Sequence, residues 1–190
     1  MEEVIRIFRR LEAIREGHFL LASGLHSPLY FDKMKVLAEP EAASFLCQRL
    51  AEKLKGKEAQ IVVGPSLGGV IIAFEVAKYL GLKCAFADRV ENKRVIRPKD
   101  ILKEGMRIAL VDDILTTGKS VKETLSALSE YESEVVAVAV ILDRSGGEVN
   151  LGIPLISLAS MKVEAYKPEE CPLCKRGIPL EVFGSATRKG

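Results

Sequence analysis

The sequence lacks a long apolar segment, because its longest unbroken apolar run, residues 135–142, has only eight residues. A membrane-spanning helix needs about 18 or more such residues, so this pattern excludes a transmembrane protein. The first residues alternate charged and apolar side chains, with no basic start and no small-residue cleavage site. They therefore predict no signal peptide, and the cytoplasm is the expected location.

An excess of charge of either sign is also missing. The 28 Lys and Arg residues are nearly balanced by 26 Asp and Glu residues, which leaves a net charge of +2. Nucleic-acid-binding domains are usually strongly basic, so we expect neither a nucleic-acid nor a membrane partner, and any anion site must be local. The 48% of hydrophobic residues is typical of a globular chain with a packed core, and 190 residues fit one domain.

Cysteine and histidine are scarce. The four cysteines are too few and too unevenly spaced for a disulfide scaffold. Cys171 and Cys174 form half of a zinc-ribbon pattern, but no second Cys-x-x-Cys or histidine pair completes it along the chain. We expect two reduced, structural cysteines, with zinc shared between two chains or a disulfide as alternatives. His18 and His26 are expected to be solvated or to pack.

Apolar periodicity predicts an amphipathic helix over residues 2–15, short extended pieces joined by turns over 18–35, and a helix over 40–55. Beyond residue 60, short apolar runs alternate with glycine-bearing loops and helical stretches, which is typical of parallel strands. The sequence thus predicts a doubly wound α/β domain. Its expected strands are 61–63, 83–87, 107–111, 135–142 and 154–158, and its later helices are 70–80 and 120–131.

Residues 108–120 carry the most informative pattern, an apolar run followed by two acids and a small, hydroxyl-rich loop. Asp112 and Asp113 end a predicted strand, which is where open α/β sheets bind ligands. The loop 116–120 precedes a helix, so its N–H groups can hold a phosphate. Carboxylates beside a phosphate need hydroxyl donors or hydrated Mg²⁺, and a phosphorylated sugar satisfies both halves. A nucleotide P-loop is excluded, because Asp113 stands where that motif requires glycine.

This string resembles the phosphoribosyl-diphosphate signature of type I phosphoribosyltransferases. The resemblance implies a parallel sheet flanked by helices with a small hood formed by the N-terminal and C-terminal segments. We expect a single domain over 1–190, with hood segments at about 17–38 and 159–185 and a core at about 39–158. The implied contacts to the ribose hydroxyls and the 5-phosphate are Asp112, Asp113, Ile114, Leu115, Thr116, Thr117, Gly118, Lys119 and Ser120.

The same resemblance implies a diphosphate site in which Ser66, Leu67 and Gly68 face the leaving group. The resemblance implies a lysine in many relatives where Ala22 stands and in several where Gly68 stands, so two positive charges are missing here. The basic stretch 89–99 corresponds to a mobile flap that can restore them, commonly in the partner subunit of a homodimer. Mg²⁺ is the implied cofactor, held mainly through the substrate, with contacts to the two acids through water. The flap candidates are Arg89, Lys93, Arg94 and Arg97, and the catalytic candidates are Asp112, Asp113, Arg89 and Lys93.

The acceptor base is suggested by two further stretches. Residues 19–31 resemble the hood of the orotate-using subfamily, in which Tyr30 and Phe31 would hold the pyrimidine together with Thr116. Arg144 stands where that subfamily pairs an arginine with the orotate carboxylate. The implied reaction converts orotate and phosphoribosyl diphosphate to orotidine 5-phosphate and diphosphate, a step of pyrimidine (UMP) synthesis. The alternatives are transfer to a purine or uracil, and a phosphoribosyl-diphosphate-sensing regulator that binds nucleic acid.

Overall fold

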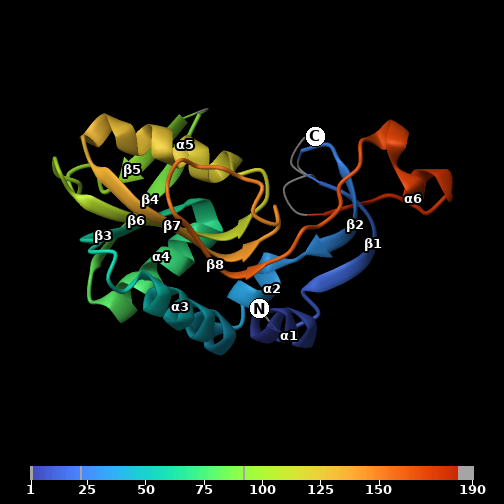
Figure 1. The fold of residues 1–190 in the computed structure, drawn as a ribbon, viewed down its shortest axis with the longest axis horizontal. Coiled ribbons are helices and arrows are strands. Elements are labelled where there is room, and N and C mark those ends of the chain that lie inside the picture. The colour runs from blue at the N-terminus through green and yellow to red at the C-terminus, as the bar shows by residue number, and fades with distance from the viewer. Residues whose placement is uncertain (1, 22, 92, 184–190) are drawn as a thin grey trace.

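The computed structural model describes residues 2–21, 23–91 and 93–183 (Figure 1). Ala22, the position at which the resemblance implied a lysine, lies outside these residues. In chain order the elements are α1 (Glu2–Arg10), β1 (Ile14–Leu20), β2 (His26–Phe31), α2 (Lys33–Leu37), α3 (Pro40–Leu54), β3 (Ile61–Pro65), α4 (Ser66–Leu80), β4 (Lys83–Val90), β5 (Lys93–Arg97), β6 (Arg107–Leu115), α5 (Lys119–Leu128), a 3₁₀ turn (Ser129–Tyr131), β7 (Glu134–Asp143), β8 (Leu155–Ser160), a second 3₁₀ turn (Pro168–Glu170), α6 (Pro172–Lys175) and β9 (Glu181–Val182).

A six-stranded sheet forms the larger layer, with strand order β5-β4-β3-β6-β7-β8. All neighbouring pairs are parallel except β4 and β5. Alternate residues of the central strands face opposite sides: Val62 and Val111 pack with α3 and α4, whereas Val63 and Leu110 pack with α5. The sheet is therefore covered by helices on both faces, which confirms the predicted α/β class and explains its continuous apolar strands.

A smaller sheet has the order β2-β1-β9 and lies beside the larger one (Figure 1). β1 pairs antiparallel with β2 and parallel with the short β9. We call these three strands the hood sheet. It joins the N-terminal strands to a segment from the other end of the chain, as the resemblance implied, although the sequence pattern did not reveal β9, α2 or α6.

The predicted first helix is wrong at its C-terminal end. α1 ends at Arg10, and Ile14 and Arg15 already belong to β1. Glu12 takes a positive φ of 50°, and the N–H of Ala13 donates to the carbonyl of Phe8 at 2.8 Å, which closes the helix. The apolar period continued through Ile14 because that residue also packs on the core, but from a strand.

The basic stretch 89–99, which the resemblance likens to a flap, is in large part a β-hairpin. β4 continues to Val90 and pairs antiparallel with β5, so that Arg89 lies opposite Arg94 and Val90 opposite Lys93. Ile96 of β5 is fully buried, and this apolar contact fixes the hairpin to the domain. The hairpin adds an antiparallel edge strand to an otherwise parallel sheet.

Three boundaries near the site also differ from the prediction. β6 continues through both acids to Leu115 instead of ending at residue 111. The predicted turn over 64–69 is absent, because β3 runs to Pro65 and α4 begins at Ser66. The remaining core strands and helices agree with the predicted ranges to within a few residues. Among the described residues, no helix combines the length and the apolar character that crossing a membrane would require.

Candidate active site

The larger sheet has a switch point between β3 and β6, because the chain leaves β3 towards β4 on one side and later adds β6 on the other. Open α/β sheets bind ligands at the carboxyl ends of the strands that flank such a point. Here β3 leads directly into α4, and β6 leads into the loop before α5. The predicted sugar-phosphate motif therefore lies at the position that the topology favours for a ligand.

The two acids of this motif are both buried. Asp112 Oδ1 accepts a hydrogen bond from the N–H of Asp113 at 2.9 Å, and Asp113 Oδ1 accepts one from the N–H of Ile114 at 2.6 Å. These local bonds fix the orientation of the carboxylates before any ligand arrives. Preorganised acceptors of this kind suit hydroxyl donors such as those of a ribose ring.

Lys33, the first residue of α2, is a site residue that the sequence analysis missed. Its Nζ lies 2.7 and 2.9 Å from the two carboxylate oxygens of Asp113. Burial opposes the charged ammonium, but the Asp113 carboxylate outweighs it, and the pKa of Lys33 is raised. The ammonium group of Lys33 thus balances the charge of Asp113.

Burial away from water, together with the charge of Asp113, raises the pKa of Asp112 to about 8. In the unfolded chain this carboxyl ionises near its ordinary value of 3.8. Between these two values the folded protein holds one proton more than the unfolded chain, so its stability falls as the pH rises.

We therefore expect the free energy of unfolding to fall between about pH 5 and about pH 9 by about 4 kcal/mol more in the wild type than in Asp112→Asn, which stays neutral throughout. Urea unfolding at several pH values measures this difference. Asp100→Asn, at an exposed acid, should keep the wild-type slope. Equal slopes in wild type and Asp112→Asn would contradict the assignment.

The loop after the acids forms the N-terminus of α5. Gly118 precedes the helix with a φ of 73°, and a Cβ there would lie 2.9 Å from Val149, so both backbone geometry and space require glycine. The side chains of Thr116, Thr117 and Lys119 are exposed at this helix start. Unsatisfied N–H groups, hydroxyls and a lysine at a helix N-terminus are suited to a phosphate.

α4 meets the acid pair from the neighbouring strand. A Cβ built on Gly68 would lie 1.9 Å from Asp113 Oδ2, closer than atoms can approach. A lysine, which the resemblance implied for this position, would displace the Asp113 carboxylate in this chain. The local packing therefore excludes a lysine at Gly68, and Lys33 supplies a cation to the same acid.

Gly68→Ala is expected to move the Asp113 carboxylate and to lower kcat/KM for phosphoribosyl diphosphate by about tenfold. Steady-state kinetics with varied donor measure this effect. The double variant Gly68→Ala/Asp113→Asn serves as the control, because effects that act through one carboxylate are not additive. Fully additive losses would show that Gly68 acts elsewhere.

The hairpin candidates divide into three groups. Arg94 is nearly buried: its Nη2 donates to Ser120 Oγ at 3.0 Å, and its Nε lies 3.4 Å from Glu123 Oε2. Arg89 pairs with the same carboxylate. Lys93 is exposed near the hairpin tip, and Arg97 lies at the base of the hairpin, opposite Phe86. The structure therefore brings Arg89 and Arg94 to α5, beside the phosphate loop, but not Arg97.

Arg144 follows β7 and lies next to β6, with its N–H donating to the carbonyl of Leu115 at 2.8 Å. Its Cζ is 4.7 Å from the centroid of the Phe31 ring. Burial lowers the pKa of Arg144 to about 10. Within the described residues its guanidinium has no carboxylate within ion-pair distance, and its Nε is buried without a hydrogen-bond acceptor. An anion is the partner that this cation lacks.

The two hood aromatics occupy different environments. Phe31 is buried between Phe8, at a centroid distance of 6.2 Å, and the guanidinium of Arg144. Tyr30 is half-buried and packs on Phe19 and Phe183, at 5.7 and 5.4 Å. The Phe31 ring therefore packs against the guanidinium of Arg144. Direct contact of either aromatic ring with a base stays a prediction.

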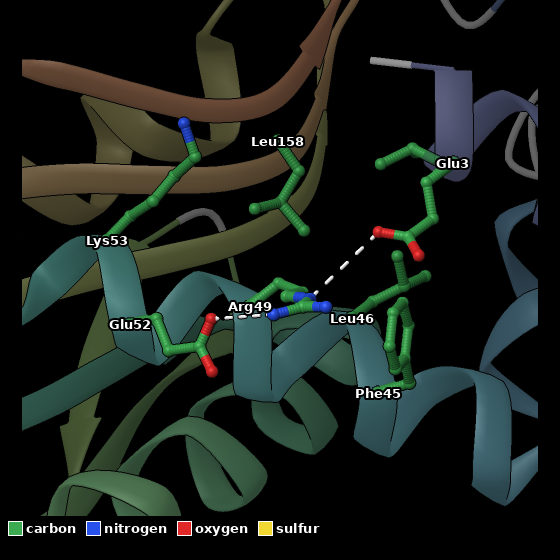
Figure 2. A pocket seen from close by; sticks show the side chains of 8 residues that line it. Glu3, Phe45, Leu46, Arg49, Glu52, Lys53 and Leu158 are labelled. Atoms are coloured by element: carbon green, nitrogen blue, oxygen red, sulfur yellow. Dashed lines mark hydrogen bonds and ion pairs between the residues drawn. The ribbon is translucent and has the colours of Figure 1, made fainter.

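A surface pocket of about 380 Å³ lies elsewhere, between α1, α3 and β8 (Figure 2). Arg49 occupies its middle and pairs with Glu52 at 3.1 Å and with Glu3 at 4.0 Å. Its central cation is thus already neutralised, and the pocket shares no residue with the acid pair or the phosphate loop. We assign it no part in the chemistry.

The histidines pack, as one of the two alternatives predicted, but the prediction that no histidine pair completes the Cys-x-x-Cys segment needs correction. His18 and His26 are buried, and their rings lie against Cys171 and Cys174. A histidine pair therefore does join the Cys-x-x-Cys segment, but from about 150 residues earlier in the chain, so no local pattern could show it.

Comparison with known proteins agrees with this geometry. The model of the phosphoribosyl transferase domain matches residues 35–165. The chain is 44% identical to an orotate phosphoribosyltransferase of Caldicellulosiruptor saccharolyticus, over 97% of this chain and 96% of the relative. It is 45% identical to that of a Thermoanaerobacter species, over 97% of each. The crystal structure of orotate phosphoribosyltransferase from Aeropyrum pernix has a TM-score of 0.74 at 24% identity, covering 83% of this chain and 93% of that one, and shares the fold.

The chain therefore belongs to the phosphoribosyltransferase family, a group of pentosyltransferases. The two relatives named above are both orotate phosphoribosyltransferases that match over nearly their full length. Within the family, the chain belongs to the orotate phosphoribosyltransferases.

Proposed function

We propose that this chain transfers the 5-phosphoribosyl group of phosphoribosyl diphosphate to orotate, and that Arg144 selects orotate by its carboxylate. The observation that carries the choice of base is the half-buried guanidinium of Arg144, which has no carboxylate partner among the described residues and is held on Phe31 beside the phosphate loop. A planar guanidinium binds a carboxylate through two parallel hydrogen bonds. Adenine, hypoxanthine and uracil have no carboxylate and leave this cation unpaired.

The donor is assigned to the switch point. Asp112 and Asp113 accept hydrogen bonds from the ribose hydroxyls, and the N-terminus of α5, with Thr116, Thr117 and Lys119, holds the 5-phosphate. Gly68, at the start of α4 and against Asp113, is the proposed backbone contact of the diphosphate. Thr116 also lies at the boundary between donor and base, because Leu115 contacts Arg144 through the backbone.

The reaction breaks the bond between ribose C1 and the diphosphate oxygen while a bond forms between C1 and N1 of orotate, and the proton of N1 passes to the leaving diphosphate or to water. Negative charge develops on the leaving group and positive charge on the ribose ring, so the site must stabilise separated charge. The Asp113 carboxylate, with Asp112 beside it, is the proposed group on the ribose side. Lys93 and Arg89 of the hairpin are the proposed partners of the diphosphate, and for Arg89 this requires release from Glu123.

Mg²⁺ fits this site through the substrate. The carboxylate oxygens at the site are hard ligands, which Mg²⁺ prefers, but Asp113 is already engaged by Lys33 and by the N–H of Ile114. We therefore assign the ion to diphosphate oxygens, with Asp112 and Asp113 in reach through water. When bound, Mg²⁺ neutralises charge on the leaving group.

We also propose a homodimer, in line with the family resemblance. Leu67 and Phe74 of α4 have 66% and 61% of their surfaces exposed, and Phe86 and Val90 of the neighbouring β4 add to this apolar face. A second copy on this face would bring apolar surface out of water near the site. Analytical ultracentrifugation of the wild type and of Phe74→Glu tests this arrangement.

The experiment that tests the function follows the loss of orotate absorbance on mixing with the protein, phosphoribosyl diphosphate and Mg²⁺. Hypoxanthine, adenine and uracil are run in parallel. Turnover with orotate alone supports the proposal. Turnover with another base would overturn the role of Arg144 but keep the donor site, and no turnover with any base would favour a regulator.

A further inference from the structure

Four metal-ligating side chains from three separate segments meet where the α6 segment contacts β1 and β2. His18 lies on β1, and His26 is the first residue of β2. Cys171 directly precedes α6, and Cys174 lies within it. In Figure 1, α6 projects at the edge of the molecule. One ligand atom of each side chain lies within 4.8 Å of every other. Three of the four residues are buried, and only Cys174 is exposed.

The distances agree with a tetrahedron around one ion. Zinc bonds of about 2.0–2.1 Å to nitrogen and about 2.3 Å to sulfur predict ligand separations of about 3.3 Å for two nitrogens and about 3.6 Å for nitrogen and sulfur. His18 Nε2 and His26 Nδ1 are 2.9 Å apart. The sulfur-to-nitrogen distances are 3.5 Å from Cys171 to His18, 3.7 Å from Cys174 to His18, and 3.3 Å from Cys174 to His26.

The surroundings orient the ligand atoms inward. His18 Nδ1 lies 2.7 Å from the carbonyl oxygen of Ile178, so this nitrogen donates and Nε2 keeps its lone pair for the centre of the cluster. His26 is fixed by backbone hydrogen bonds in both directions with Tyr166, at 2.8 Å each. The carbonyl of Cys171 accepts from Lys175 and that of Cys174 accepts from Gly177, which holds the short α6 turn.

Charge balance also favours a divalent ion. Two thiolates and two neutral imidazoles around Zn²⁺ give a neutral unit, which can be buried without an uncompensated charge. A disulfide between the two cysteines would satisfy the sulfurs but leave two buried imidazole nitrogens facing each other and sharing at most one proton. In a reduced cluster without a metal ion, the two thiols would donate only weak hydrogen bonds to these nitrogens.

We propose that His18, His26, Cys171 and Cys174 of one chain bind a structural zinc ion that fastens the C-terminal segment to the hood sheet. With four protein ligands the site has no open position for a substrate, so its role is in folding and not in the reaction. The ion would fix β1 and β2 at one end, and β2 carries Tyr30 and Phe31 at the other. The zinc proposal does not depend on the identity of the base.

The test begins with the wild-type protein. Purified without metal chelators, it is expected to contain one equivalent of zinc per chain by elemental analysis. The zinc should be released when a mercurial reagent blocks the thiols. Protein refolded with Co²⁺ in place of zinc should show the intense visible bands of tetrahedral cobalt together with thiolate-to-cobalt charge transfer.

Variants locate the site. Cys171→Ser/Cys174→Ser should lose the bound zinc and lower Tm by about 10 °C. Cys84→Ser, at a cysteine far from the cluster in sequence, should keep one equivalent of zinc and the wild-type Tm. His18→Ala should lose the thiolate-rich cobalt spectrum if it folds.

Wild-type protein that contains no zinc and binds no Co²⁺ would overturn the proposal even if every variant failed to fold. A Cys171–Cys174 disulfide found by mass spectrometry in freshly purified protein would overturn it as well. So would one equivalent of zinc that persists in the double cysteine variant, because the ion would then lie elsewhere.

Discussion

Arg144→Ala is expected to lower kcat/KM for orotate by about 100-fold or more, while KM for phosphoribosyl diphosphate stays within about twofold. The guanidinium lies on the Phe31 ring with no carboxylate partner within the described part of the chain, so the orotate carboxylate would be its main charged contact. Removing it leaves that carboxylate desolvated without a bidentate donor. Steady-state kinetics with each substrate varied in turn measure both constants.

Two matched variants make this result specific. Arg144→Lys keeps the charge but loses the planar fork, so an intermediate loss is expected. Arg49→Ala removes an arginine that pairs with Glu3 and Glu52 in the remote pocket of Figure 2, and should leave the kinetics unchanged. Any slow transfer to uracil, which has no carboxylate, should be equal in wild type and Arg144→Ala. An Arg144→Ala enzyme with wild-type kcat/KM for orotate would sink the assignment.

The parts of the site that sequence could predict are those carried by one short segment. Asp112, Asp113 and the loop to Ser120 lie on consecutive residues, and β6 and the N-terminus of α5 place them at the carboxyl edge without help from distant residues. Arg144 follows β7 in the same way. Because strand ends in a parallel sheet share one edge, the topology alone brings these segments together.

What sequence could not supply depends on contacts between distant residues. Lys33 meets Asp113 across 80 positions, and His18 meets Cys171 across 153. Neither residue stands in a periodic pattern that marks its partner. The same limit explains the absent lysine at Gly68, since only the packing of α4 against β6 shows that a side chain there would collide with Asp113.

Backbone conformation was a second limit. Glu12 ends α1 in a left-handed conformation that glutamate rarely adopts, so nothing in its identity marks the helix end. At the hairpin, the five basic residues gave no sign of a strand, whereas the buried Ile96 and the pairing of β4 with β5 decide the structure. In both places tertiary contacts overrode the local signal.

Asp113→Asn is the second variant with a large expected effect, a loss of about 100-fold in kcat/KM for phosphoribosyl diphosphate. The buried carboxylate can accept charge-assisted hydrogen bonds from ribose hydroxyls, each worth about 1.5–3 kcal/mol, and these weaken when the acceptor is a neutral amide. Asparagine keeps the shape and one acceptor oxygen, and Lys33 has 45% of its side chain exposed to water, so the fold should survive. Kinetics with varied donor and a thermal melt measure the two effects separately.

Comparison with Lys33→Met separates binding from structure. This variant breaks the same ion pair but leaves the carboxylate able to accept from the ribose, so a loss of only about tenfold is expected. Asp100→Asn, at an exposed acid in the connection after β5, should behave as the wild type. If Asp113 served only to hold Lys33, then Asp113→Asn and Lys33→Met would lose activity equally. A larger loss in Asp113→Asn, confined to the donor, is the result that identifies the carboxylate as a ribose ligand.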